Sequence, residues 1–172
     1  MNNRPQSRKF FYAAVAAAII FLTGCATKGY HTPTQSSGPL VGGTGEAFAW
    51  PLEGRVVLPY AAKEEGVSLK GAVMEARENA PVTAARSGKV VLVDEKLRGY
   101  GRTVLIEHDG GFATVYARLA EILVRPGQTV TRGQPIGKVG SAGKDHRPSL
   151  YFEIRQNSKA QDPSVYLPGR RF

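Results

Sequence analysis

The chain of 172 residues is poor in the side chains that most often bind metals or form cross-links, with one cysteine and three histidines. A single cysteine excludes an intramolecular disulfide, so an oxidising compartment would add no cross-link to the fold. Long apolar runs are scarce too. The run from Phe10 to Leu22 is shorter than the about 20 residues that a helix needs to cross a membrane. We therefore expect no permanent transmembrane helix.

The first 25 residues instead have the layout of an export signal. Basic residues precede the apolar run, and Thr23-Gly24-Cys25 follows it, which predicts a secretory signal peptide over residues 1–24. Leu22 to Cys25 resembles a bacterial lipobox, and this resemblance implies that Cys25 is lipidated and begins the mature chain. Acyl chains contribute about 0.8 kcal/mol per buried CH₂, so several of them would anchor the protein to a membrane. Because Ala26 follows Cys25, the resemblance further implies the outer membrane, facing the periplasm.

The charge of the chain narrows the choice of partners. The net charge is +9, and without residues 1–24, which hold three bases and no acid, 20 basic and 14 acidic side chains leave a net charge of +6. A basic exported protein favours acidic partners such as peptidoglycan carboxylates, anionic lipid or an acidic protein surface. Nucleic acid is not expected as a partner in that compartment.

Composition divides the mature chain into a linker and one domain. Residues 25–47 are rich in Gly, Ser, Thr and Pro, and a flexible coil of about 20 residues spans roughly 25 Å on average. The domain is expected over residues 48–172, which suffices for one compact core.

Short β-branched and apolar runs separated by Gly and Pro indicate an all-β domain, a single compact β-sandwich or barrel-like fold. We expect strands at Arg55–Leu58, Gly71–Glu75, Pro81–Ala84, Lys89–Asp94, Thr103–His108, Phe112–Tyr116 and Leu150–Arg155. The continuous apolar run in Lys89–Asp94 predicts a strand covered on both faces. The segment from Gln128 to Gly137 is expected to close the β core.

Several segments fall in the order and spacing of the lysostaphin/LytM-type peptidoglycan endopeptidases. They include Ile106-Glu-His-Asp-Gly-Gly, Gly133-Gln-Pro-Ile-Gly, Tyr116-Ala-Arg-Leu and Pro148-Ser-Leu-Tyr-Phe-Glu. The resemblance implies that Leu69, Val73 and Tyr151 stand where those enzymes hold zinc ligands. It likewise implies that Arg118 and Ser149 stand where they hold catalytic histidines. A catalytic zinc needs three protein ligands, so the resemblance predicts a domain without zinc, cofactor or catalysis.

Cationic and aromatic residues take the place of the ligands. Side chains alternate across a strand, so Ser149, Tyr151, Glu153 and Arg155 should share one face while Leu150, Phe152 and Ile154 face the core. Tyrosine and arginine provide contact area and paired hydrogen bonds to carboxylates. We predict a partner-binding groove lined by Lys70, Tyr116, Arg118, Tyr151 and Arg155.

These departures resemble the LytM-domain activators of cell-wall amidases, the EnvC and NlpD type. The resemblance rests on Lys70-Gly71, Leu-Arg-Gly-Tyr-Gly of residues 97–101 and Arg147 to Arg155. It implies an outer-membrane lipoprotein whose groove binds the regulatory helix of a periplasmic N-acetylmuramoyl-L-alanine amidase. The amidase would then cleave septal peptidoglycan so that daughter cells separate.

Two alternatives remain open at this point. The first is a non-enzymatic peptidoglycan-binding module. The second is an active zinc endopeptidase with rearranged ligands, for which Asp145, His146 and Glu153 are the candidate set. All three histidines, His31, His108 and His146, are nevertheless expected to be solvated or hydrogen-bonded side chains rather than ligands.

Overall fold

The computed structural model describes residues 45–141 and 147–169. The predicted signal peptide, the predicted lipidation site Cys25 and most of the linker lie outside these residues, as do Asp145 and His146. Within the described part, no helix combines the length and the apolar character that crossing a membrane would require.

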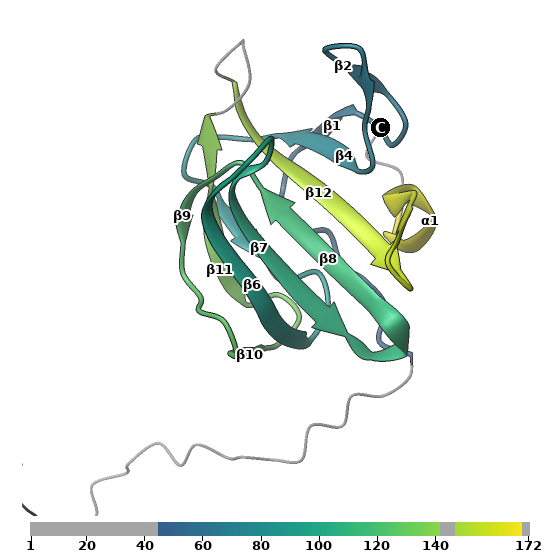
Figure 1. Cartoon of the computed structure of the whole chain (residues 1–172), viewed down its shortest axis with the longest axis vertical. Coiled ribbons are helices and arrows are strands. Elements are labelled where there is room, and N and C mark those ends of the chain that lie inside the picture. The colour runs from purple at the N-terminus through teal and green to yellow at the C-terminus, as the bar shows by residue number, and fades with distance from the viewer. Residues whose placement is uncertain (1–44, 142–146, 170–172) are drawn as a thin grey trace, which may run out of the picture. The chain divides into compact units, whose positions relative to one another are not determined.

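Strands make up most of the described chain (Figure 1). In order they are β1 (Arg55–Leu58), β2 (Lys63–Glu64), β3 (Val67–Ser68), β4 (Ala72–Glu75), β5 (Pro81–Thr83), β6 (Gly88–Leu97), β7 (Gly101–His108), β8 (Phe112–Ala117), β9 (Leu119–Ile122), β10 (Thr129–Val130), β11 (Pro135–Ser141), β12 (Pro148–Gln156) and β13 (Lys159–Gln161). A 3₁₀ turn, η1 (Asp109–Gly111), joins β7 to β8, and a short helix, α1 (Pro163–Tyr166), follows β13. The all-β class is confirmed, and each of the seven predicted strands overlaps an observed one.

All described strands except β2 and β3 form one large sheet, in which every pairing is antiparallel. Its main path runs β1-β4-β12-β8-β7-β6-β10. β11 pairs with β5 and β9 along its first part and with β12 at Gly140 and Ser141. β11 therefore links the main sheet to a second layer, formed by β5, β9 and the first part of β11. At one edge of the main sheet, β10 pairs with β6. The segment from Gln128 to Gly137, expected to close the core, contains β10 and the start of β11.

The core lies between these layers and is formed by one face of most strands; β2, β3 and β13 contribute no buried residue to it. Leu150, Phe152 and Ile154 of β12 are fully buried in it, as the predicted alternation requires. Gly71, just before β4, passes so close to β12 that a Cβ there would collide with the carbonyl oxygen of Phe152. Only glycine fits at this approach.

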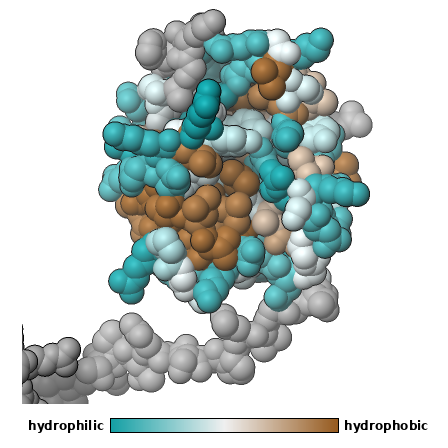
Figure 2. Space-filling view, viewed as in Figure 1, coloured by the Kyte–Doolittle hydropathy of each residue, from teal (hydrophilic) through white to brown (hydrophobic). Residues whose placement is uncertain are grey.

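The prediction that β6 is covered on both faces is wrong. Val90 is buried, but Val91 is 39% and Leu92 is 38% exposed. The outer face of β6 and β7 carries an open apolar patch, which Figure 2 shows as a broad brown area. An apolar run shows only the composition of a strand. Burial of both its faces also requires another element to pack on each face, and no described element packs on this one.

The two ends of the domain are tied to each other. Glu46 lies two residues ahead of the expected domain start, and its carboxylate accepts a hydrogen bond from the Ser87 backbone N–H at 2.8 Å. The Phe48 ring packs edge-on against Tyr166, and the Trp50 indole N–H donates to the Pro168 carbonyl at 2.7 Å. The chain therefore enters and leaves the domain at the same place.

Candidate functional site

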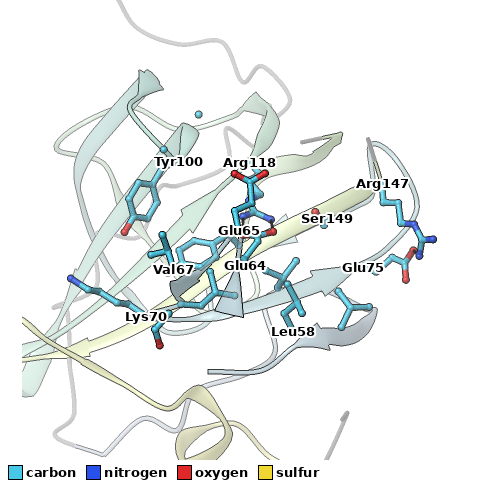
Figure 3. Close-up of a pocket in the computed structure, with 17 residues that line it drawn as sticks. Leu58, Glu64, Glu65, Val67, Lys70, Glu75, Tyr100, Arg118, Arg147 and Ser149 are labelled. Carbon is cyan, nitrogen blue, oxygen red and sulfur yellow. Dashed lines mark hydrogen bonds and ion pairs between the residues drawn. The ribbon is translucent and has the colours of Figure 1, made fainter. Parts of the chain in front are cut away.

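A cavity of about 1110 Å³ lies over the outer face of β4 and β12. Its walls come from β1, the hairpin β2–β3, the turn at Tyr100 and the residue after β8. Figure 3 shows Arg118 and Glu64 in the middle of the cavity, with Tyr100 and Lys70 to one side and Arg147 and Glu75 to the other. The five positions that the sequence comparison singled out all line it: Leu69, Val73, Arg118, Ser149 and Tyr151.

The residues at the three ligand positions do not fit a zinc ion. Leu69 and Val73 carry no donor atom, and they pack with Tyr151, Ala117 and Leu58 in a small apolar cluster. Burial raises the pKa of the Tyr151 hydroxyl, and its hydrogen bond to Glu153 raises this pKa further. The phenol therefore stays protonated at neutral pH. Among the described residues, no three or more His, Cys, Asp or Glu side chains are grouped as a metal site would need.

A buried carboxylate organises the floor of the cavity. Glu153 has no exposed surface, and its Oε1 accepts hydrogen bonds from both the Tyr151 hydroxyl at 2.7 Å and the Tyr100 hydroxyl at 3.1 Å. Arg155 donates to its other oxygen at 2.7 Å. A buried charge is tolerated when it is paired and its lone pairs are satisfied. The network fixes Tyr151 and holds the Tyr100 turn against the sheet.

Arg118 is positioned by an unusual backbone conformation. Its φ is +64°, in the left-handed region that non-glycine residues seldom adopt. Its N–H donates to the Tyr100 carbonyl at 3.0 Å, and its own carbonyl accepts from Gly140 N–H at 3.1 Å. The guanidinium lies 5.5 Å from the centre of the Tyr151 ring. These contacts direct a cation into the cavity.

The hairpin β2–β3 supplies the partner of this cation. The two Arg118 nitrogens donate to the two Glu64 oxygens, one of these bonds at 3.2 Å, so the pair is bidentate. The hairpin forms a two-stranded sheet apart from the main one, with its ends closed by the bonds between Ala61 and Leu69 and between Leu69 and Ala62. Val67 at its tip is 68% exposed. The ion pair therefore joins this hairpin to the floor of the cavity.

Two of the five predicted groove residues lie elsewhere. Tyr116 is fully buried in the core, where its hydroxyl accepts from the Ala85 N–H at 2.8 Å and from Thr114 at 2.9 Å, so its place in the groove is a wrong prediction. Alternation would put residues 116 and 118 on one face, but the left-handed turn at Arg118 breaks that alternation. Arg155 is half-buried beside Glu153 and is not among the residues that line the cavity. Lys70 is exposed and lines the cavity.

Sequence reasoning missed Glu64 and the part that Glu153 plays. The run Lys63-Glu64-Glu65 has the composition of a solvated turn, and nothing in its spacing points to Arg118. The Gly-Tyr-Gly around Tyr100 predicts a turn, because glycine readily adopts positive φ. Both flanking glycines do have positive φ, and the turn brings Tyr100 back over the sheet to Glu153, which the sequence did not indicate.

His108 is buried and hydrogen-bonded, whereas the sequence had left open a solvated or a hydrogen-bonded side chain. Its ring nitrogens lie 2.9 Å from the Ser87 carbonyl oxygen and 2.8 Å from the Thr114 hydroxyl. Burial lowers the pKa of its imidazole. The alternative zinc set cannot be placed, because Asp145 and His146 lie outside the described residues.

Comparisons with known proteins agree with this geometry. Residues 67–163, more than half of the chain, match peptidase family M23. The chain is 41% identical over 134 residues to a lipoprotein NlpD/LppB homolog of Pseudomonas aeruginosa, covering 78% of this chain and 43% of that protein. It is 39% identical over 145 residues to the murein hydrolase activator EnvC of Escherichia coli, covering 80% and 34% respectively.

Among solved structures, a zinc-containing peptidase from Vibrio cholerae is similar, with a TM-score of 0.61 and 30% sequence identity over 68% of this chain and 39% of that one. The chain thus spans less than half the length of each of these three proteins. The similarity therefore concerns one part of each of these proteins, and not their whole length.

Proposed function

This chain belongs to peptidase family M23. We propose that its domain nevertheless does not hydrolyse peptidoglycan but activates a periplasmic N-acetylmuramoyl-L-alanine amidase. The partner would be the regulatory helix of the amidase, bound in the cavity over β4 and β12. Activation would serve septal peptidoglycan cleavage and the separation of daughter cells. Two relatives with the same domain, from Escherichia coli and Salmonella, carry the name murein hydrolase activator.

The observation that carries the proposal is a retained cavity whose chemistry has changed. Hydrolysis by this family needs a metal that activates water, and the three ligand positions hold two aliphatic side chains and a protonated phenol. What remains is an apolar centre, formed by Leu58, Leu69 and Val73. Three cations and three carboxylates surround it: Lys70, Arg118, Arg147, Glu64, Glu65 and Glu75. Such a lining suits an amphipathic helix whose polar face carries charged residues, acidic ones among them.

The N-terminal sequence and the names of the relatives support a membrane-anchored placement. We propose that Cys25 is lipidated and that the lipid holds the domain at the periplasmic face of the outer membrane. Relatives are named lipoproteins, one of them an outer membrane antigenic lipoprotein of Haemophilus influenzae. The linker ahead of the domain would let the cavity reach both an amidase and the peptidoglycan.

The test is release of dye from labelled sacculi by periplasmic amidases of the source organism. Residues 26–172, which contain every described strand, are added to each amidase and also assayed alone. We expect release only when an amidase is present. Release by the protein alone would contradict the loss of catalysis. Cosedimentation with sacculi without any effect on amidases would favour a peptidoglycan-binding module.

A charge reversal in the cavity locates the activity. Lys70→Glu should weaken stimulation at least tenfold, because an exposed cation at the cavity is replaced by an anion facing acidic residues of the partner. Lys89→Glu on β6 makes the same change of charge outside the cavity and should leave stimulation as in the wild type. Equal effects of both variants would mean that net charge alone, and not the cavity, governs the interaction.

A further inference from the structure

The cavity contains an internal competitor for its most buried cation. Arg118 has 14% of its side-chain surface exposed and Glu64 has 29%, so solvent reaches the pair but does not surround it. The contact is bidentate, the geometry in which a guanidinium binds a carboxylate best. Glu64 therefore occupies the position on Arg118 that a carboxylate from outside the chain would take.

The element that brings Glu64 to this position is weakly built. Its two strands have two residues each and form a sheet apart from the main one. A two-stranded hairpin of this size is marginally stable by itself. Glu65 at its turn has a φ of +50°, which is unfavourable for a residue with a Cβ. The hairpin can therefore shift at small cost if its ion pair is replaced.

Arg118, by contrast, is fixed. Its backbone is bonded on both sides, to Tyr100 and Gly140, and its guanidinium lies over the Tyr151 ring, which Glu153 holds in place. A strained residue held by its surroundings is a common feature of binding sites. The rigid member of the pair is the receptor, and the movable member is the hairpin.

From this asymmetry we infer that Arg118 is the carboxylate-recognition point of the cavity and that Glu64, on the hairpin β2–β3, masks it until an acidic side chain of a protein partner displaces it. The inference rests on the proposed function, since the partner is the amidase helix. The hairpin then sets a threshold, because only a segment that offers both a carboxylate and an apolar surface replaces what Glu64 and Leu69 provide.

The first experiment measures the mask itself and needs no amidase. Hydrogen exchange of residues 61–69 is compared in the full chain in detergent micelles, as wild type, Glu64→Gln and Glu53→Gln. Glu53 is exposed and lies outside the cavity lining, so its variant is the matched control for charge. We expect faster exchange only in Glu64→Gln. Equal exchange in all three proteins would overturn the role of the ion pair in holding the hairpin.

The second experiment measures competition. An amidase that the wild type stimulates is titrated with each variant, and Glu64→Gln should reach half-maximal stimulation at a concentration roughly three- to tenfold lower, because less of the protein is masked. Glu53→Gln should match the wild type. An unchanged or higher concentration for Glu64→Gln would overturn the inference, since Glu64 would then be neutral or a contact for the partner.

Arg118→Lys identifies the receptor. This change keeps the charge but removes the bidentate geometry, and the gain from Glu64→Gln should disappear in the double variant. A full gain in that background would overturn the assignment of Arg118. If Glu64→Gln binds sacculi more tightly without amidase, the displacing carboxylate belongs to a stem peptide and the assignment to a protein partner fails. If the wild type stimulates no amidase, the proposed function fails, while the exchange experiment still reports on the mask.

Discussion

Two ends of one sheet face are covered in opposite ways. Leu92, Leu105, Val115 and Glu153 lie directly opposite one another across β6, β7, β8 and β12 and so share the outer face. Their exposure falls along this row, from 38% at Leu92 to 6% at Val115 and 0% at Glu153. A leucine lies open to solvent while a carboxylate is fully enclosed.

The difference teaches that covering elements, and not residue types, decide burial on this face. Tyr100 and the hairpin β2–β3 lie over the end at β12. Tyr100 brings the hydroxyl that donates to Glu153, and the hairpin brings the Glu64 carboxylate that pairs with Arg118. At the end near β6 no described element lies over Leu92. The free energy of unfolding should therefore depend strongly on the enclosed end and weakly on the open end.

The largest effect is expected at the enclosed end. Glu153→Ala leaves two tyrosine hydroxyls without their acceptor and Arg155 with only the Ser158 carbonyl oxygen. Removing one member of a buried charge pair costs about 3–5 kcal/mol. Urea unfolding followed by circular dichroism measures this loss. Glu107→Ala, at an exposed position on the same face of β7, should change the free energy of unfolding by less than about 0.5 kcal/mol. A loss below about 1 kcal/mol for Glu153→Ala would show that the network contributes little.

Lowering the pH should reduce the free energy of unfolding through a group on the core face of these strands, which distinguishes that face from the outer one. His108 lies on the core face of β7, and burial lowers the pKa of its imidazole below the usual value. The unfolded chain, with a pKa of about 6.5, then binds the proton more readily than the folded one. This contribution to stability is complete above about pH 6.5 and is lost as the pH falls toward the folded pKa, by at most about 1.4 kcal/mol per pH unit.

Unfolding in urea at pH 7.5 and pH 5.5 measures this contribution. The wild type should lose more stability than His108→Gln between the two values, by at most about 1.4 kcal/mol, because glutamine does not titrate. An equal loss in both proteins would assign the acid sensitivity to other groups, with the carboxylates of the outer face as the first to examine.

The smallest effect is expected at the open end. Leu92→Ser removes a partly exposed side chain, so the free energy of unfolding should change by about 0.5 kcal/mol or less. Leu150→Ala, in the core beneath the same sheet, should cost about 2–5 kcal/mol. Thermal unfolding of the two variants, side by side, measures both. A large loss for Leu92→Ser would mean that a further segment of the chain covers this patch in solution.

Sequence patterns predicted those parts of the fold that depend on local composition. The strands at Arg55–Leu58 and Thr103–His108 were located because β-branched runs are bounded there by turn residues. The alternation along β12 correctly sent Phe152 to the core. The exposure of Leu92 was not predictable in this way, because it depends on what another part of the chain leaves uncovered.

The candidate site was predictable as a place but not as an arrangement. Motif positions identified Leu69, Val73 and Tyr151, and all three line the cavity. Tyr116 was misplaced because a single left-handed residue, Arg118, reverses the expected face. Glu64 could not be found, since its contact spans 54 positions in the sequence and acidic residues in an exposed turn are common.

The joined ends of the domain determine how it would carry a mechanical load. A pull on the chain ahead of Glu46 meets the Glu46–Ser87 bonds first, then the ring of Phe48, and then the Trp50–Pro168 bond, before any tension reaches β1. These contacts act as a clamp between the linker and the rest of the domain. Force from an anchor would be borne at the clamp, so the cavity walls would keep their shape while the domain is held under tension.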